Sequence, residues 1–339
     1  MNKISNAVFF FCRLFLLCIV FISCRRTSPA KNGGNYEPVD RLIVGFSQIG
    51  AESAWRIFNS KSMQDAAVRE GVQLLFSDAE QKQENQIKAI RSFIMYQVDV
   101  IVFVPIVQDG WDLVLKEAKD AGIPVIVCDR KIVTEDDSLY ECFIGTDSVE
   151  EGRDAARFLQ KKYAFREGIV NIMEIRGTDG SSASDDRMKG FHEIIDVNKK
   201  FNVIYSESGD FMRSRGKEIA RNILEANNNR LIINGNRVDA IFSANDGMTL
   251  GFLDVLAEHG IKTGKDITVV TVDAQQEAMD KLALGEINCV VECNPDIGMQ
   301  VMELAKKIAA GEEIPRSTHV EERVFSEFDS LENIAPRGY

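Results

Sequence analysis

The sequence predicts an α/β protein made of two doubly wound parallel-sheet domains, joined by a hinge, with a ligand cleft between them. Three observations lead to this prediction. The chain has 339 residues, which is too long for one typical domain. From Arg41 onward, short β-branched runs alternate with amphipathic stretches. The runs are continuously apolar, as expected of parallel strands that helices cover on both faces.

The strands are predicted at the short apolar runs. In chain order they are 42–46, 72–76, 98–104, 124–128, 140–144, 169–175, 203–206, 238–242, 267–272 and 287–291. Helices are predicted between them, where apolar residues recur at spacings of three and four. Ile87, Ile90 and Ile94 share one face of the stretch 86–96, and the stretch 111–121 follows the same pattern.

The number of strands indicates where the chain divides. A sheet of this many strands is more easily split into two than kept as one. We predict that the first domain contains residues 41–145 and 294–322, and that the second contains residues 146–293 and 323–339. Right-handed crossovers then give a doubly wound sheet in each domain. Ligands of open α/β sheets bind at the carboxyl ends of the strands, so those ends hold the candidate site.

The first 24 residues differ in composition from the rest of the chain. An almost wholly apolar run from Ala7 to Ile22, interrupted by Arg13, follows Lys3. It ends just before Cys24, which two arginines follow. This segment resembles a bacterial lipoprotein signal, in which the cysteine becomes lipidated. We therefore expect a signal peptide over 1–23, a lipid on Cys24, and a flexible tether over 24–40. An uncleaved signal anchor is the alternative, because the apolar run is marginal for a membrane span.

Charge and cysteine content exclude several classes of protein. The formal net charge is −12, and it becomes −14 once the two basic residues of the predicted signal are removed. Nucleic-acid binding is not expected, because a protein that neutralises phosphates needs an excess of lysine and arginine. The four cysteines beyond the anchor have no metal-ligand spacing, and the chain has only three histidines. We therefore expect no metal and no cofactor.

Those four cysteines are interpreted as buried free thiols. They are Cys128, Cys142, Cys289 and Cys293. A disulfide stays open as an alternative in an exported protein, and the sequence alone does not pair them.

Polar and aromatic side chains follow the ends of the predicted strands. The candidate ligand-binding residues are Glu52, Trp55, Arg56, Asp129, Arg130, Arg187, Phe211, Asn245, Asp273 and Glu292. Carboxylates accept hydrogen bonds from paired hydroxyls, and arginine and asparagine side chains donate to the same oxygens. Trp55 and Phe211 can stack on the C–H faces of a sugar ring. This set predicts a small neutral sugar as the ligand.

Several long strings carry a resemblance to a known family. They are GFSQIGAESAWR (45–56), QKQENQIKAIRSFI (81–94), GWDLVLKEAKDAGIPVIVCDR (110–130), GDFMRSRGKE (209–218), AND (244–246) and GY (338–339). They resemble the periplasmic sugar-binding proteins of ABC importers, of the ribose-binding type, and within these the galactofuranose-binding branch. The match runs along about 41–339 without large gaps.

The resemblance implies roles for the candidate residues. Five match positions that hydrogen-bond the sugar in that family: Asp129, Arg130, Arg187, Asn245 and Asp273. Trp55 and Phe211 match its aromatic walls, while Glu52, Arg56 and Glu292 match the galactofuranose-type branch. One departure is Ala274, which stands where the family usually has a glycine.

The resemblance also implies how the protein works. We expect an exported, lipid-anchored monomer on the periplasmic side of the cell envelope, which closes on a monosaccharide and delivers it to an ABC permease. We expect no enzymatic activity and no nucleic-acid partner. A receptor module that presents the bound sugar to a chemoreceptor or sensor kinase is the alternative, because both roles use the closed form as their signal.

The same residues do not support an enzyme or a transcription regulator. The string GFSQIG after the first strand lacks the GxGxxG spacing of a dinucleotide loop. The three histidines have no nucleophile or carboxylate partner in a motif, so a Ser-His-Asp arrangement is unsupported. Asp129 and Asp273 as a glycosidase pair are disfavoured, because Arg130 and Arg187 nearby would keep both carboxylates ionised. A sugar-responsive transcription regulator would need an N-terminal helix-turn-helix in place of the signal segment.

Overall fold

The computed structural model describes residues 41–332 and 334–339. The predicted signal peptide, the lipidated Cys24 and the predicted tether over 24–40 lie outside the described residues. None of the helices in the described part of the chain is long and apolar enough to cross a membrane.

The first sheet has six strands, all of them parallel, in the order β13-β5-β4-β3-β1-β2. Their bounds are β1 Ile43–Gln48, β2 Gln73–Asp78, β3 Val100–Phe103, β4 Val125–Cys128, β5 Cys142–Gly145 and β13 Ser317–His319. Its central strands are buried along their whole length, which accounts for the continuous apolar runs in the sequence.

The second sheet also has six strands, in the order β14-β12-β11-β10-β6-β7. Their bounds are β6 Val170–Arg176, β7 Phe201–Ser208, β10 Ala240–Ser243, β11 Thr268–Asp273, β12 Cys289–Glu292 and β14 Val324–Ser326. All pairs in it are parallel except β12 with β14, which run antiparallel. A short hairpin of β8 (Ile232–Ile233) and β9 (Asn236–Arg237) stands apart from both sheets.

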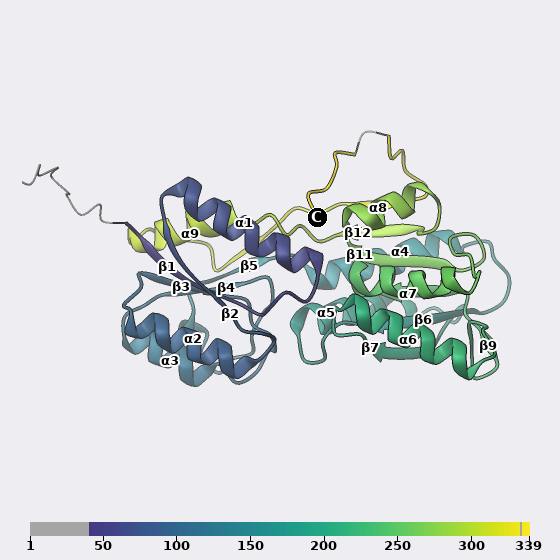
Figure 1. Ribbon diagram of the computed structural model, residues 1–339, viewed down its shortest axis with the longest axis horizontal. Coiled ribbons are helices and arrows are strands. Elements are labelled where there is room, and N and C mark those ends of the chain that lie inside the picture. The colour runs from purple at the N-terminus through teal and green to yellow at the C-terminus, as the bar shows by residue number, and fades with distance from the viewer. Residues whose placement is uncertain (1–40, 333) are drawn as a thin grey trace, which may run out of the picture. The chain divides into compact units, whose positions relative to one another are not determined.

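Helices cover both sheets (Figure 1). Those near the first sheet are α1 Ala54–Glu70, α2 Gln83–Met95, α3 Asp112–Asp120 and α9 Gly298–Ala309, with a short 3-10 turn η1 at Asp137–Leu139. Those near the second sheet are α4 Ser148–Lys162, α5 Ser182–Ile195, α6 Arg213–Ala226, α7 Asp246–Glu258 and α8 Gln276–Ala283. We call the two groups, each with its sheet, the first and second lobes.

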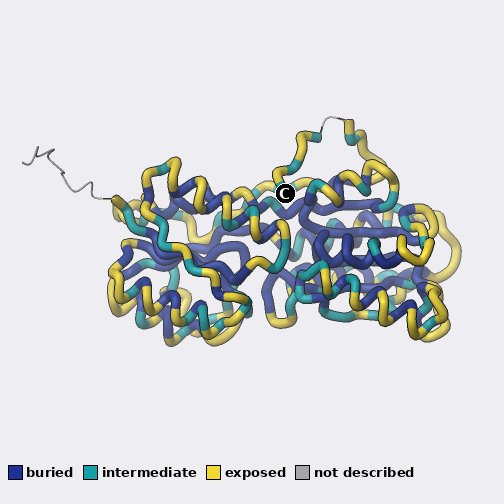
Figure 2. Tube along the Cα trace, viewed as in Figure 1, coloured by how far each residue is buried: buried dark blue, intermediate teal, exposed yellow. Residues whose placement is uncertain are grey.

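The side chains of alternate residues along a strand point to opposite faces of the first sheet. Val100 and Val102 pack in a core with α1 and α9, whereas Ile101 and Phe103 pack in another core with α2 and α3. This is the two-faced burial that a doubly wound sheet requires. Figure 2 shows the same buried strands inside more exposed helices. The predicted fold class is confirmed.

Within residues 41–332 and 334–339, the chain passes between the two sheets at three places. It leaves β5 for α4 after Gly145, leaves β12 for α9 after Glu292, and runs from β13 to β14 over 320–323. The residue-level domain boundaries given above stay a prediction.

Candidate ligand-binding site

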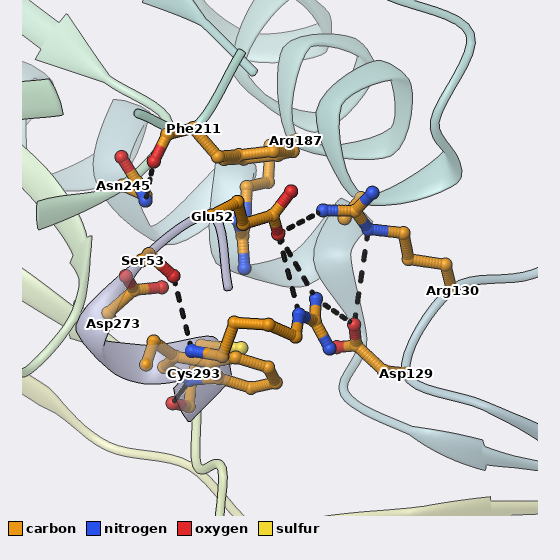
Figure 3. A pocket seen from close by; sticks show the side chains of 12 residues that line it. Glu52, Ser53, Asp129, Arg130, Arg187, Phe211, Asn245, Asp273 and Cys293 are labelled. Atoms are coloured by element: carbon orange, nitrogen blue, oxygen red, sulfur yellow. Dashed lines mark hydrogen bonds and ion pairs between the residues drawn. The ribbon is translucent and has the colours of Figure 1, made fainter. Parts of the chain in front are cut away.

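A pocket lies at the carboxyl ends of strands from both sheets, and side chains of both lobes line it (Figure 3). Nine of the ten candidate residues are among those that line it. The full set is Glu52, Ser53, Trp55, Arg56, Asp129, Arg130, Ala183, Arg187, Phe211, Asn245, Asp273 and Cys293. This placement follows from the parallel topology, which gathers the ends of the strands at one edge of each sheet.

The start of α1 presents two of these side chains. Ser53 caps the helix, because its hydroxyl accepts a hydrogen bond from the Arg56 backbone N–H at 3.2 Å. Trp55 and Arg56 therefore stand in the first turn, and both are buried. The indole N–H of Trp55 donates to the carbonyl of Cys293 at 2.6 Å, which fixes the ring against the chain that leaves the second sheet.

Two arginines and two carboxylates of the first lobe form one buried network. Arg56 Nη2 donates to Asp129 Oδ2 at 2.6 Å, and Arg130 Nη2 donates to Glu52 Oε1 at 2.6 Å. Arg56 also contacts Glu52 at 3.4 Å. Charges are buried at low cost only when they are paired in this way. The four groups together are electrically neutral, so this side of the pocket suits an uncharged ligand.

Two donor atoms of this network are left over. Arg56 Nη1 and Arg130 Nε are buried and have no hydrogen-bond partner among the residues that the structure describes. Arg130 Nε lies 4.0 Å from the nearest Asp129 oxygen, which is beyond hydrogen-bonding distance. Buried donors are normally satisfied. These two N–H groups are therefore available to acceptor oxygens of a bound ligand.

Arg187 brings a third guanidinium group from α5 of the second lobe. Its Nε donates to Glu151 Oε2 at 2.5 Å, and its Nη1 donates to the Ala244 carbonyl at 2.8 Å. Burial alone would lower the pKa of Arg187, but the charge of Glu151 raises it well above its usual value. Arg187 is therefore a fixed cation with a rigid orientation.

Phe211 lies close to a guanidinium group of each lobe. The Arg130 guanidinium carbon is 5.0 Å from the centre of the Phe211 ring, and that of Arg187 is 5.9 Å away. Contacts of this kind fix both cations by attraction to the face of the ring. The Arg56 guanidinium lies over Trp55 in the same manner, at 4.6 Å.

Asn245 and Asp273 complete the second-lobe side. Asn245 caps α7, since its Oδ1 accepts from the Met248 N–H at 2.9 Å while its Nδ2 donates to the Phe211 carbonyl. The expectation that Arg187 keeps Asp273 ionised is wrong, because burial outweighs the nearby cation. Burial raises the pKa of Asp273 well above its usual value, and the nearby Asp246 adds to this. Burial likewise raises the pKa of Asp246 to about 7. These two carboxyl groups titrate as a pair.

The family is decided by comparison with known proteins. A model of the periplasmic binding protein domain matches residues 44–313. The chain belongs to the periplasmic binding protein domain family. This family consists of solute-binding proteins and not of enzymes, and membership implies export to the periplasm. The resemblance inferred from the sequence is thereby confirmed.

Individual relatives of this periplasmic binding protein are similar over most of their length. The galactofuranose-binding protein YtfQ of Escherichia coli (strain K12) is 39% identical over 266 residues, which are 78% of this chain and 81% of that protein. A Mycobacterium smegmatis protein solved in complex with β-D-fucofuranose is 44% identical with a TM-score of 0.80, covering 85% of this chain and 92% of the other.

A third relative is the periplasmic binding component of the arabinose ABC transporter from Shewanella sp. ANA-3, solved with α- and β-L-arabinofuranose. It is 39% identical with a TM-score of 0.78, covering 84% of this chain and 91% of that one.

One candidate residue of this periplasmic binding protein is placed elsewhere. Glu292 does not line the pocket, because its carboxylate pairs with the guanidinium group of Arg337. Three lining residues were not among the candidates. Ser53 follows the candidate Glu52, and Cys293 follows the candidate Glu292. Cys293 also comes directly after strand β12, so the rule that ligands bind at strand ends could have found it. Ala183, on the first turn of α5, carries no chemical signal in the sequence.

The four cysteines are buried and unpaired in the described part of the chain. Burial raises the pKa of the Cys293 thiol well above its usual value. The thiol near the pocket is therefore a neutral group, in keeping with a binding site for an uncharged molecule.

Proposed function

We propose that this periplasmic binding protein is the sugar-binding component of an ABC importer, and that its ligand is a neutral monosaccharide in the furanose form. The observation that carries the proposal is the pair of unpartnered buried donors, Arg56 Nη1 and Arg130 Nε, within a charge-balanced network. Sugar hydroxyls supply the acceptor oxygens that these donors lack.

The choice of a furanose is supported by the relatives. The named protein from Escherichia coli binds galactofuranose, and the solved structures from Mycobacterium smegmatis and Shewanella hold fucofuranose and arabinofuranose. Each is at least 39% identical to this chain over most of its length. The aromatic rings of Trp55 and Phe211 in the pocket suit the C–H faces of such a ring.

Binding is proposed to act through hinge closure. Arg130 reaches Phe211 of the other lobe, the Lys131 N–H donates to Ser182 at 2.6 Å, and the Gln108 N–H donates to the Gly180 carbonyl at 2.9 Å. These contacts join the lobes beside the pocket, and a sugar that touches both lobes adds to them. The permease would recognise the closed form, with the protein held at the membrane by a lipid on Cys24 and acting as a monomer.

The experiment is a thermal-shift and calorimetry series with the full chain. D-galactose, D-fucose, L-arabinose and D-ribose are compared with their methyl pyranosides, which cannot open to the furanose ring. A ligand at 100 times its Kd stabilises by about 2.7 kcal/mol, which raises Tm by roughly 5 °C or more. We expect at least one free sugar to do this while its methyl pyranoside does not.

The bound ring form is read directly. An L-arabinose or D-galactose sample labelled with ¹³C at the anomeric carbon shows the furanose resonance when bound. A bound pyranose would contradict the furanose assignment, and the absence of any stabilising sugar would overturn the proposed function.

A further inference from the structure

The last described residues, 337–339, contact the backbone of a strand end that lines the pocket. The hydroxyl of Tyr339 donates to the backbone carbonyl of Asp273 at 2.9 Å. In the other direction, the N–H of Gln276 donates to the carbonyl of Tyr339 at 2.7 Å. Residues 337–339 therefore lie directly against the strand end that carries Asp273 into the pocket.

The backbone at that strand end has an unusual conformation. Asp273 has a φ of 122° and Ala274 has a φ of 70°, in the region that favours glycine. Both residues are buried. A left-handed residue with a side chain persists only when its surroundings hold it there. Glycine would adopt this backbone conformation without strain, but the residue at position 274 is alanine.

Arg337 holds the second carbonyl of the same turn. Its Nε donates to the Ala274 carbonyl at 3.2 Å, and its backbone N–H donates to Gln276 Oε1 at 2.7 Å. Its Nη2 pairs with Glu292, which orients the side chain. The carbonyls of residues 273 and 274 are thus both bound by residues 337 and 339.

The same residues also contact the other lobe. The Tyr339 ring lies 5.2 Å from the Phe58 ring of α1, centre to centre. At Gly338 a Cβ atom would stand only 2.6 Å from the Phe58 ring, so a glycine permits the approach. Phe58 is half a turn beyond Arg56 on the helix that presents Trp55 and Arg56 to the pocket.

We propose that Tyr339 and Arg337 are positioning residues for ligand binding, which clamp the strained Asp273–Ala274 turn so that the Asp273 carboxyl group faces the sugar. This inference rests on the proposed function for its binding readout. In this proposal Glu292 does not contact the ligand, but it orients Arg337. Burial raises the pKa of Tyr339, so its hydroxyl remains a donor at all ordinary pH values.

The binding test is a double-mutant cycle measured by calorimetry with the sugar found in the panel above. Tyr339→Phe removes the hydroxyl and keeps the ring on Phe58, and we expect it to weaken binding about three- to ten-fold, the range of one neutral hydrogen bond. Ala274→Gly relieves the strain that the clamp holds. In the Ala274→Gly protein, we expect Tyr339→Phe to change the affinity less than two-fold.

Tyr205→Phe is the matched control, because it removes a half-buried hydroxyl that pairs with Glu207 away from the pocket. It should bind like the wild type. The clamp is refuted if Tyr339→Phe binds as tightly as the wild type, or if its loss is the same with Gly at position 274.

A second measurement needs no sugar and separates this inference from the proposed function. Amide hydrogen exchange of the ligand-free protein should become faster at Gln275 and Gln276 in Tyr339→Phe, and stay unchanged there in Tyr205→Phe. Unchanged exchange in Tyr339→Phe would overturn the clamp. A wild type that binds no sugar would instead overturn the proposed function, while the exchange result would still decide the clamp.

Discussion

At the level of single residues, the pocket depends on guanidinium groups whose hydrogen bonds are only partly used. Arg56 and Arg130 each hold a carboxylate at 2.6 Å, and each keeps one buried nitrogen donor without a partner in the described part of the chain. The ion pairs hold the two side chains in fixed orientations. A ligand then binds to donors that are already oriented, which reduces the entropy lost on binding.

Removal of one guanidinium group tests this view. We expect Arg130→Ala to weaken sugar binding roughly ten- to hundred-fold, since hydrogen bonds to charged groups are worth about 1.5–3 kcal/mol. Glu52 would also lose its 2.6 Å partner. Isothermal titration calorimetry measures the change.

Arg91→Ala is the control for this prediction, because Arg91 forms an exposed pair with Glu117 on the first lobe. Its affinity should match that of the wild type. An unchanged Kd in Arg130→Ala would remove Arg130 from the site.

The rule that ligands bind at strand ends accounts for most of the candidate set at this scale. It places nine of the ten candidates around one pocket, since position along a strand is visible in the sequence. It does not place Glu292, which pairs in register with Asp273 on the neighbouring strand yet contacts Arg337. That contact depends on a segment 45 residues away along the chain, and no local pattern reveals it.

At the level of elements, α4 and α5 pack unusually closely through glycines. A Cβ atom at Gly152 of α4 would lie 2.0 Å from the Arg187 carbonyl oxygen, and one at Gly190 of α5 would lie 1.9 Å from the Val149 carbonyl oxygen. Neither distance is possible, so the two helices approach backbone to backbone. The position of Arg187 in the pocket is set by this packing.

We expect Gly190→Ala to destabilise the protein by about 1–3 kcal/mol, because overpacking costs more than the better helix propensity of alanine returns. The separation of α4 and α5 should also move Arg187 and weaken sugar binding. Urea unfolding and calorimetry measure the two effects.

Lys189→Ala, at an exposed neighbour on the same helix, should change neither quantity by much. Gly190→Ala with wild-type stability would show that the helices can separate at no cost, contrary to this packing argument.

The elements themselves were predictable where hydrophobic periodicity is strong. All five predicted strands of the first domain, among them 98–104 and 124–128, overlap strands of the first sheet. The sequence did not predict β13 and β14, which have three residues each, as strands. Ser317–His319 is polar and largely exposed, and its extended form comes from pairing with β5, a neighbour far away in sequence.

At the level of the whole molecule, the three passages between the lobes meet at one buried cluster. Thr146 Oγ1 is 3.7 Å from Cys293 Sγ. The sulfur of Cys293 and one carboxylate oxygen each of Glu151 and Glu322 all lie within 4.8 Å of one another. Burial raises the pKa of Glu322 to about 11, and the charge of Glu151 adds to this effect. Glu322 is therefore a neutral acid near neutral pH, and its proton can satisfy Glu151.

This cluster links the connections between the lobes to the pocket. Glu151 accepts the hydrogen bond of Arg187 with one oxygen, and its other oxygen has no donor among the described residues. We infer that a protonated Glu322, whose carboxyl oxygen lies within 4.8 Å of an oxygen of Glu151, supplies that donor and thereby helps to orient Arg187. Two ionised carboxylates beside one guanidinium would leave an uncompensated buried charge.

Glu322→Gln tests this proton through the pH dependence of stability. A carboxyl group whose pKa is raised on folding, from 4.5 to about 11, keeps its proton in the folded protein while the unfolded chain loses it. Its contribution to stability is complete below about pH 4.5 and declines as pH rises toward 11. Glutamine is neutral and can still donate to Glu151, but it carries no such decline.

The free energy of unfolding in urea should therefore be similar for the variant and the wild type at pH 4.5. At pH 8 the variant should be more stable by at least about 1 kcal/mol. This follows because one unit of pKa shift corresponds to about 1.36 kcal/mol. Glu321→Gln changes an exposed neighbour and should show no pH-dependent difference. A difference between Glu322→Gln and the wild type that stays constant from pH 4.5 to 8 would mean that Glu322 ionises as an ordinary surface carboxylate. Glu151 would then orient Arg187 without a proton on Glu322.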